Sequence, residues 1–136
     1  MNETIATGLR LPSGLVALPD GRLALVEMDA SRRNMTLYDA GGASRDVFRI
    51  GGAPSGIALD GDGCFWVAGG PEDSLVRLSA QGRVLQVIEG SADGPFLHPN
   101  ALAFGPDGLL SMTDSGFRLA DLLEGGHINP DFFKAA

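Results

Sequence analysis

Residues 99–114 have the sequence PNALAFGPDGLLSMTD, and the same pattern occurs at residues 12–27 (PSGLVALPDGRLALVE) and 54–69 (PSGIALDGDGCFWVAG). The three segments begin 42 and 45 residues apart and align without gaps. Each opens with proline and two small residues, continues with alternating apolar residues, and reaches an Asp-Gly pair before a second apolar run. This pattern predicts a β-hairpin in each segment. We expect the Asp-Gly pair to supply the positive φ angles of a tight turn.

A second predicted hairpin follows each of the first two segments. It is clearest in residues 74–88, SLVRLSAQGRVLQVI, where apolar and polar residues alternate on both sides of a glycine-containing turn, and residues 35–50 have MTLYDAGGASRDVFRI in the equivalent place. Four strands in a unit of this length are typical of a β-propeller blade. Because one unit alone would leave a sheet face uncovered, stacked units are expected to bury the core between them. The sequence therefore predicts an all-β fold, a partial β-propeller with about two and a half four-stranded antiparallel blades of a six-bladed fold.

The third unit differs from the other two. The segment after Asp114, SGFRLADLLEGGHINPDFFKAA, contains no second hairpin, and residues 117–123 predict a short helical turn that ends at Gly125-Gly126. We expect one partial propeller domain over residues 1–136, with units near 12–53 and 54–98 and an incomplete unit over 99–136. Because propellers close with four to eight blades, we expect the chain to be a fragment, a truncated product, or a subunit of a homo-oligomer that closes the ring.

The composition of the chain argues against several classes of partner and against a disulfide. The formal net charge of −7 would repel a phosphate backbone, and no Lys or Arg cluster offsets it, so nucleic acid is not expected as a partner. No secretory signal and no run of about 18 apolar residues is present, so we expect no membrane association and a cytoplasmic location. Cys64 is the only cysteine, which excludes an internal disulfide, and its apolar surroundings predict a buried side chain.

Three stretches resemble a known family. Residues 9–27 (LRLPSGLVALPDGRLALVE), 51–70 (GGAPSGIALDGDGCFWVAGG) and 97–116 (LHPNALAFGPDGLLSMTDSG) are similar to the N-terminal half of SMP-30/gluconolactonase-like proteins. These are six-bladed, calcium-dependent propellers. The resemblance extends over roughly residues 7–116, and the string from Pro99 to Asp114 is its most characteristic part. It implies hydrolysis of a small-molecule sugar lactone, with one divalent cation that polarises the lactone carbonyl or activates water.

The resemblance also implies site residues. In the family, the residue after the blade-opening proline faces the central channel, and this chain has Ser13 where Glu is common, Ser55 where Asn is common, and a retained Asn100. It thus implies Asn100, Ser55 and Ser13 as substrate-binding residues and Asn100 and Asp114 as metal ligands. Because Ca²⁺ takes six to eight oxygen ligands, we expect it to bind only if residues outside this chain complete the site. The missing ligands indicate a truncated or degenerate member with no identified catalytic residue.

Each of these residues also has a structural interpretation. Asn100 suits a turn residue whose side chain caps a neighbouring amide. Asp114 aligns with Glu27 and Gly69, and we favour a role in capping the Ser115-Gly116 turn over one in lining the channel. The string that contains Glu27 is similar to the blades of streptogramin lyases, which use magnesium and a histidine base, although we favour a structural acidic residue at a strand end.

The remaining candidates are histidines and aromatic residues. His98 precedes Pro99 and is either a base near the channel or, as we favour, a surface loop residue, and His127 lies in the glycine-rich tail. The aromatic side chains in the strand runs are expected to pack between the sheets: Phe65, Trp66 and Phe104.

Three functional hypotheses remain open. The first is a calcium-dependent lactone hydrolase, and the second is a non-catalytic NHL-like propeller scaffold that binds a protein or peptide, which the serines at ligand positions favour. The third is a propeller similar to streptogramin lyases. The sequence contains no Gly-x-Ser-x-Gly nucleophile elbow and no phosphate-binding P-loop, which argues against those classes of enzyme.

Overall fold

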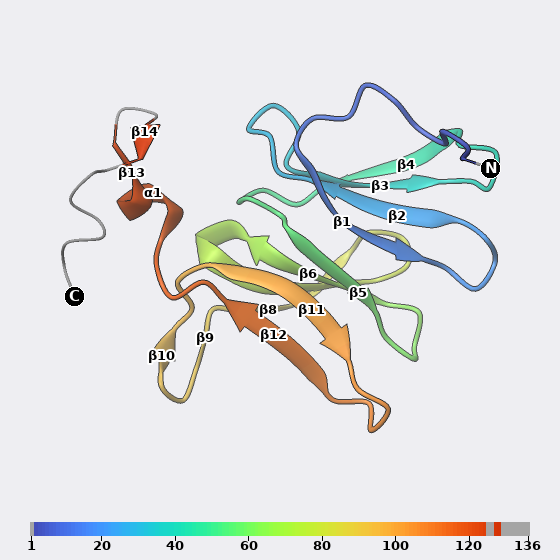
Figure 1. Ribbon diagram of the computed structural model, residues 1–136. Helices are drawn as coiled ribbons and strands as arrows, with labels where there is room; N and C mark the ends of the chain where they lie inside the picture. Colours follow the sequence, from blue (N-terminus) through green and yellow to red (C-terminus); the bar gives the residue numbers. More distant parts are fainter. Residues whose placement is uncertain (1, 125–126, 129–136) are drawn as a thin grey trace.

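The computed structural model describes residues 2–124 and 127–128, and the chain forms an open stack of antiparallel sheets (Figure 1). Two sheets have four strands each, in chain order. The first contains β1 (Pro12–Ala17), β2 (Leu23–Glu27), β3 (Asn34–Tyr38) and β4 (Ser44–Arg49). The second contains β5 (Gly56–Leu59), β6 (Phe65–Gly70), β7 (Ser74–Leu78) and β8 (Val84–Ile88), with the 3₁₀ turn η1 (Pro71–Asp73) between β6 and β7. The all-β partial propeller is therefore confirmed.

The third unit contains one hairpin, as expected, formed by β11 (Pro99–Phe104) and β12 (Leu110–Asp114). A small, unexpected hairpin precedes it, with strands β9 (Gly90–Ser91) and β10 (Gly94–Pro95). After β12 come α1 (Leu119–Leu122), β13 (Leu123–Glu124) and β14 (His127–Ile128). The short helical turn is confirmed by α1, whereas its predicted end at residues 125–126 lies outside the described residues. Within the described part of the chain, no helix is long and apolar enough to cross a membrane.

The hairpin turns correct one expectation. Five hairpins share one backbone pattern, in which the glycine N–H donates to the carbonyl three residues earlier and a second bond closes the loop around it. Only the glycine has a positive φ, whereas Asp20, Asp62 and Asp107 do not. The turn is therefore a three-residue loop that ends in a glycine bulge, not a two-residue turn with two positive φ angles. The five glycines are Gly21, Gly42, Gly63, Gly82 and Gly108.

The hydrophobic core lies between the two four-stranded sheets. Because side chains on a strand alternate between its faces, every second residue of β2, β3, β6 and β7 points into this layer. The buried cluster consists of Ala24, Val26, Met35, Leu37, Ile57, Phe65, Val67, Val76 and Leu78. Burial of each Val, Leu or Phe side chain contributes about 1.5–3 kcal/mol, so the contact between the first two units stabilises both sheets.

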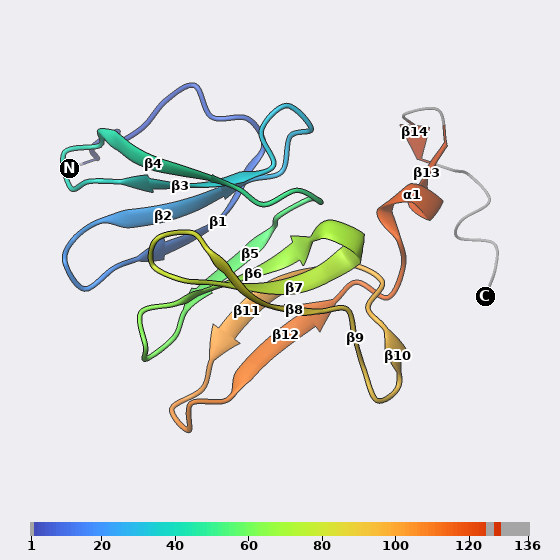
Figure 2. The same cartoon turned by 180° about the vertical axis from the view of Figure 1, so that it is seen from behind.

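The first strands of the three units lie side by side, with β5 between β1 and β11 (Figures 1 and 2). Their spacing depends on glycine: a Cβ on Gly14 would lie 2.7 Å from the carbonyl oxygen of Ser55, and a Cβ on Gly56 would collide with the carbonyl of Asn100. The equivalent residue of the third unit is Ala101, which is exposed. Residues 13–14, 55–56 and 100–101 hold equivalent positions in the three units, and we call these three pairs together the inner edge.

An aspartate joins the strands of the second unit. Asp60 accepts backbone N–H bonds from Asp62 and Cys64, each at 2.9 Å, and its other oxygen accepts from the Trp66 indole at 3.0 Å and from Arg77 at 2.8 Å. The Arg77 guanidinium also lies 5.6 Å from the centre of the Trp66 ring. Trp66 and Cys64 are both half-buried, which corrects the prediction of a buried Cys64. Phe65 is buried in the core as expected, and Phe104 is half-buried.

Candidate functional site

The inner edge contains the three residues that follow the opening prolines. Ser13 and Asn100 are both exposed. Each lies in an irregularity of its strand, because the pairing register shifts between Pro12 and Leu15 in β1 and at the equivalent place in β11. Such bulges re-aim side chains and are frequent next to binding sites. The structure therefore presents one hydroxyl and one amide at equivalent positions of the first and third units.

Ser55 has a different environment from the other two. Its side chain is buried, and its hydroxyl oxygen lies 3.1 Å from the carbonyl oxygen of Pro99 and 3.2 Å from that of Asn100. A hydroxyl has one proton to donate, and the two nearer acceptors belong to the next unit, while the Ala68 carbonyl of its own unit lies at 3.5 Å. Ser55 thus links the second unit to the third. Its predicted role in substrate binding is not tested by this arrangement and stays a prediction.

Asp114 fixes the loop that leads into the third unit. Its carboxylate accepts N–H bonds from Leu97 at 2.9 Å, His98 at 3.0 Å and Gly116 at 2.8 Å. Desolvation opposes ionisation, but the N–H bonds from Gly116, Leu97 and His98 outweigh it, so the pKa of the Asp114 carboxyl is lowered. The bond from the Gly116 N–H confirms the predicted capping of the Ser115-Gly116 turn. A metal-binding role for Asp114 stays a prediction.

Glu27 occupies the equivalent position of the first unit. Glu27 pairs with Pro12 across the strands, as Asp114 pairs with Pro99, and it accepts the Arg10 backbone N–H at 2.6 Å. In the second unit the equivalent residue is Gly69, where a Cβ would collide with the carbonyl of Ala53. The carboxylates of the first and third units therefore hold the loop before the proline, whereas in the second unit the backbone itself fills that space.

His98 is buried, with an exposed fraction of 8%, and this corrects the prediction of a surface loop residue. Its backbone N–H donates to Asp114 and its carbonyl accepts from the Ser115 N–H at 3.0 Å, so both backbone polar groups have partners. The sequence carried no signal for this burial, because Leu11, which precedes Pro12 as His98 precedes Pro99, is 63% exposed. His127 lies in β14 and is exposed.

The donor set of the inner edge does not fit Ca²⁺. Among the described residues, no group of three or more His, Cys, Asp or Glu side chains converges on one point. Asn100 offers a single amide oxygen, and Asp114 already accepts three backbone N–H bonds. Because Ca²⁺ needs six to eight oxygen ligands, these residues alone would leave most of its coordination shell to water. What the inner edge can do is accept and donate hydrogen bonds to a polar ligand through Ser13 and Asn100.

Comparison with solved structures shows the same fold. A gluconolactonase from Xanthomonas campestris matches with a TM-score of 0.70 at 18% identity, over 82% of this chain and 37% of that one. A luciferin-regenerating enzyme matches with a TM-score of 0.64 at 21% identity, over 85% of this chain and 41% of that one. An inactive variant of virginiamycin B lyase from Staphylococcus aureus, solved with quinupristin, matches with a TM-score of 0.62 at 16% identity, over 76% of this chain and 34% of that one.

These similarities place the chain among propeller proteins at the level of fold. No protein-family model matches it, and no curated protein matches it. The chain spans less than half the length of each of the three structures. At such low identity, shared architecture carries no specific activity.

Proposed function

We propose that this chain forms part of a propeller that handles a sugar lactone, and that its contribution is to orient the ligand through Asn100 and Ser13. The observation that supports this role is the matched exposure of the two side chains at the strand bulges of the inner edge. The amide of Asn100 both donates and accepts hydrogen bonds, and the Ser13 hydroxyl does the same. A lactone carbonyl and the neighbouring sugar hydroxyls have the complementary chemistry.

The proposal assigns the divalent cation to residues outside this chain. Asp114 acts here as a positioning residue, because its bonds to Leu97 and His98 hold the loop immediately before Pro99 and Asn100. The chain alone is expected to bind the lactone weakly and to leave it intact, since the described residues include no cluster that could hold a cation. Closure of the ring by a second copy of the chain stays a prediction, which the molar mass in solution tests.

The test is a nuclear magnetic resonance titration of the labelled chain with a sugar lactone. We expect shifts that saturate at residues 13 and 100–101, with binding weakened about tenfold by Asn100→Ala, the loss of one or two hydrogen bonds. Asn2→Ala is the matched control, because Asn2 is also exposed but lies before the first strand. The proposal is contradicted if no resonance of the inner edge shifts, or if Asn100→Ala and Asn2→Ala bind the lactone equally well.

The second candidate function is a non-catalytic scaffold for a protein or peptide. The observation that favours it is the Ser55 hydroxyl, which the backbone of the third unit engages where the family commonly has a channel-facing amide. In this case the chain should melt at the same temperature with and without a chelator and show no saturable response to any sugar lactone. A lactone response confined to the inner edge would count against the scaffold.

A further inference from the structure

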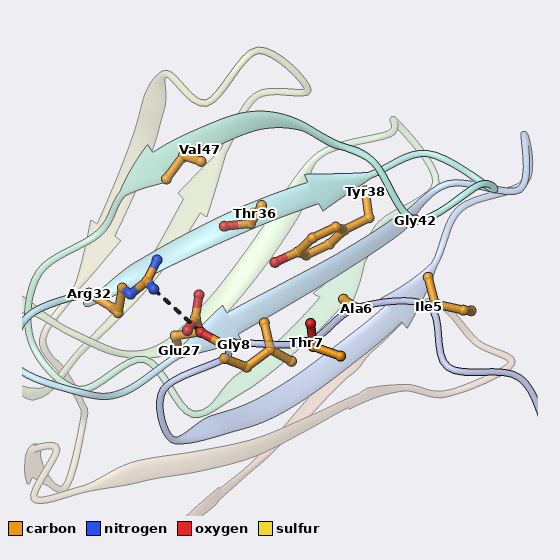
Figure 3. A pocket seen from close by; sticks show the side chains of 11 residues that line it. Ile5, Ala6, Thr7, Gly8, Glu27, Arg32, Thr36, Tyr38, Gly42 and Val47 are labelled. Carbon is orange, nitrogen blue, oxygen red and sulfur yellow. Dashed lines mark hydrogen bonds between the residues drawn. The ribbon is translucent and has the colours of Figure 1, made fainter.

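Residues 5–9 form a strap across the outer face of the first sheet, and a polar pocket of about 390 Å³ lies between strap and sheet (Figure 3). The outer face is the one that the core does not use: Ala24, Val26, Met35 and Leu37 point toward the second sheet, so Glu27, Thr36 and Tyr38 point away from it. The strap approaches closely at one end, where a Cβ on Gly42 would collide with the carbonyl of Ile5.

Glu27 places a negative charge at the base of this pocket. Its side chain is 1% exposed, and its hydrogen bond among the described residues is the one from the Arg10 backbone N–H. Within the same part of the chain, no Lys or Arg forms an ion pair with it. A buried carboxylate is costly unless a cation or several donors compensate it. The pocket therefore favours a cationic group beside Glu27.

Arg32 places a positive charge at the mouth of the pocket. It is exposed, and its guanidinium makes a long contact of 3.4 Å with the carbonyl oxygen of Gly8. Figure 3 shows the guanidinium directed toward the space between Glu27 and Thr36. A guanidinium with free N–H groups matches a carboxylate in a two-pronged hydrogen bond.

Thr36 and Tyr38 add hydroxyl groups to the lining of this pocket. Figure 3 shows the Tyr38 phenol and the Thr36 side chain above the strap, on the same side of the sheet as Glu27. Burial and the negative charge of Glu27 raise the pKa of the Tyr38 phenol, so it stays protonated and able to donate at neutral pH. The lining of the pocket thus combines a buried carboxylate, an exposed guanidinium and two neutral hydroxyls.

We propose that this pocket binds a small zwitterion of the α-amino acid class, with its ammonium group on Glu27 and its carboxylate on Arg32. The volume lies within the range of small-molecule sites. A metal ion fits less well, because Glu27 is the only acidic side chain among the described residues that line the pocket. The pocket is separate from the inner edge, and the inference does not depend on lactone binding.

The experiment is a calorimetric titration of the full chain with each of the protein α-amino acids in turn. We expect saturable binding of at least one, and no binding of its N-acetyl and amide derivatives, since each derivative removes one charge of the zwitterion. Arg32→Gln should weaken binding about tenfold, the loss of a charge-assisted hydrogen bond. Arg83→Gln, an exposed arginine on a hairpin turn of the second unit, should leave it unchanged.

Glu27→Gln tests the other half of the site and keeps an acceptor for the Arg10 N–H. It should also weaken binding at least tenfold, and its melting curve shows whether the fold survives. The proposal is overturned if no amino acid binds, if the N-acetyl and amide derivatives bind as well as the parent, or if Arg32→Gln and Arg83→Gln behave alike.

Discussion

Gly56 of the second unit lies against the backbone carbonyl of Asn100 in the third unit. The two are so close that a Cβ atom on residue 56 would collide with this carbonyl. The same relationship joins Gly14 to the carbonyl of Ser55, so each inner strand packs on the next through a glycine. We predict that Gly56→Ala forces β5 and β11 apart and lowers the free energy of unfolding by about 1–3 kcal/mol, as overpacking does. Chemical denaturation measures the loss.

The matched control for this change is Gly61→Ala. Gly61 lies in the hairpin turn of the second unit, and a Cβ there would meet nothing within 4 Å. Its substitution should change the free energy of unfolding by less than about 0.5 kcal/mol. If Gly56→Ala and Gly61→Ala changed the free energy of unfolding equally, close packing of β5 on β11 would not be the role of Gly56.

Ser55→Ala separates a structural hydroxyl from a ligand-binding one. The hydroxyl lies within hydrogen-bonding distance of two backbone carbonyls of the third unit, so its removal should lower the free energy of unfolding by about 1–2 kcal/mol. Affinity for a sugar lactone should stay within a factor of about two, because the side chain is buried. A variant of unchanged stability that no longer binds the lactone would assign Ser55 to the site instead.

Asp60 makes the free energy of unfolding depend on pH in the acidic range. Desolvation raises its pKa, but the N–H bond from Cys64 and the bonds from Arg77, Trp66 and Asp62 together lower the pKa of this carboxyl. A group with a lowered folded-state pKa stabilises the fold above its unfolded pKa of about 3.9 and loses that contribution as the pH falls through the folded value. Stability should therefore decline below about pH 4.

Asp60→Asn tests this assignment. At neutral pH it should lower the free energy of unfolding by about 2–3 kcal/mol, because Arg77 and the Trp66 indole lose a charged acceptor. The remaining decline in acid should be shallower than in the wild type. Asp93→Asn, at an exposed aspartate in the small β9–β10 hairpin, is the control and should keep the wild-type pH profile. An unaltered profile in Asp60→Asn contradicts the assignment.

Repetition made most of the fold predictable. The three aligned segments and the two further hairpins are where the sequence places them, because alternating apolar residues and turn glycines act locally. The turn type was wrong, since the sequence shows that Asp precedes Gly but not how many residues the loop takes. The β9–β10 hairpin was missed because its strands have two residues each and carry no periodicity.

The environment of the site residues was harder to predict because it depends on contacts between units. Ser13, Ser55 and Asn100 are equivalent in sequence, yet only Ser55 is covered by the following unit. His98 was expected at the surface because it lies in a loop, but its side chain is buried in a loop that Asp114 holds through backbone N–H bonds. The pocket beneath the strap was missed altogether, since the sequence does not show that residues 5–9 fold across the sheet and cover Glu27.

The central claim is that the inner edge orients a lactone without itself holding the cation. The most direct measurement is one lactone titration followed at the resonances of Ser13 and Asn100, first in chelator and then in excess calcium. The account predicts saturable shifts at both residues with the same dissociation constant in the two conditions. Shifts that appear only with calcium, or that leave both residues unmoved, would contradict it.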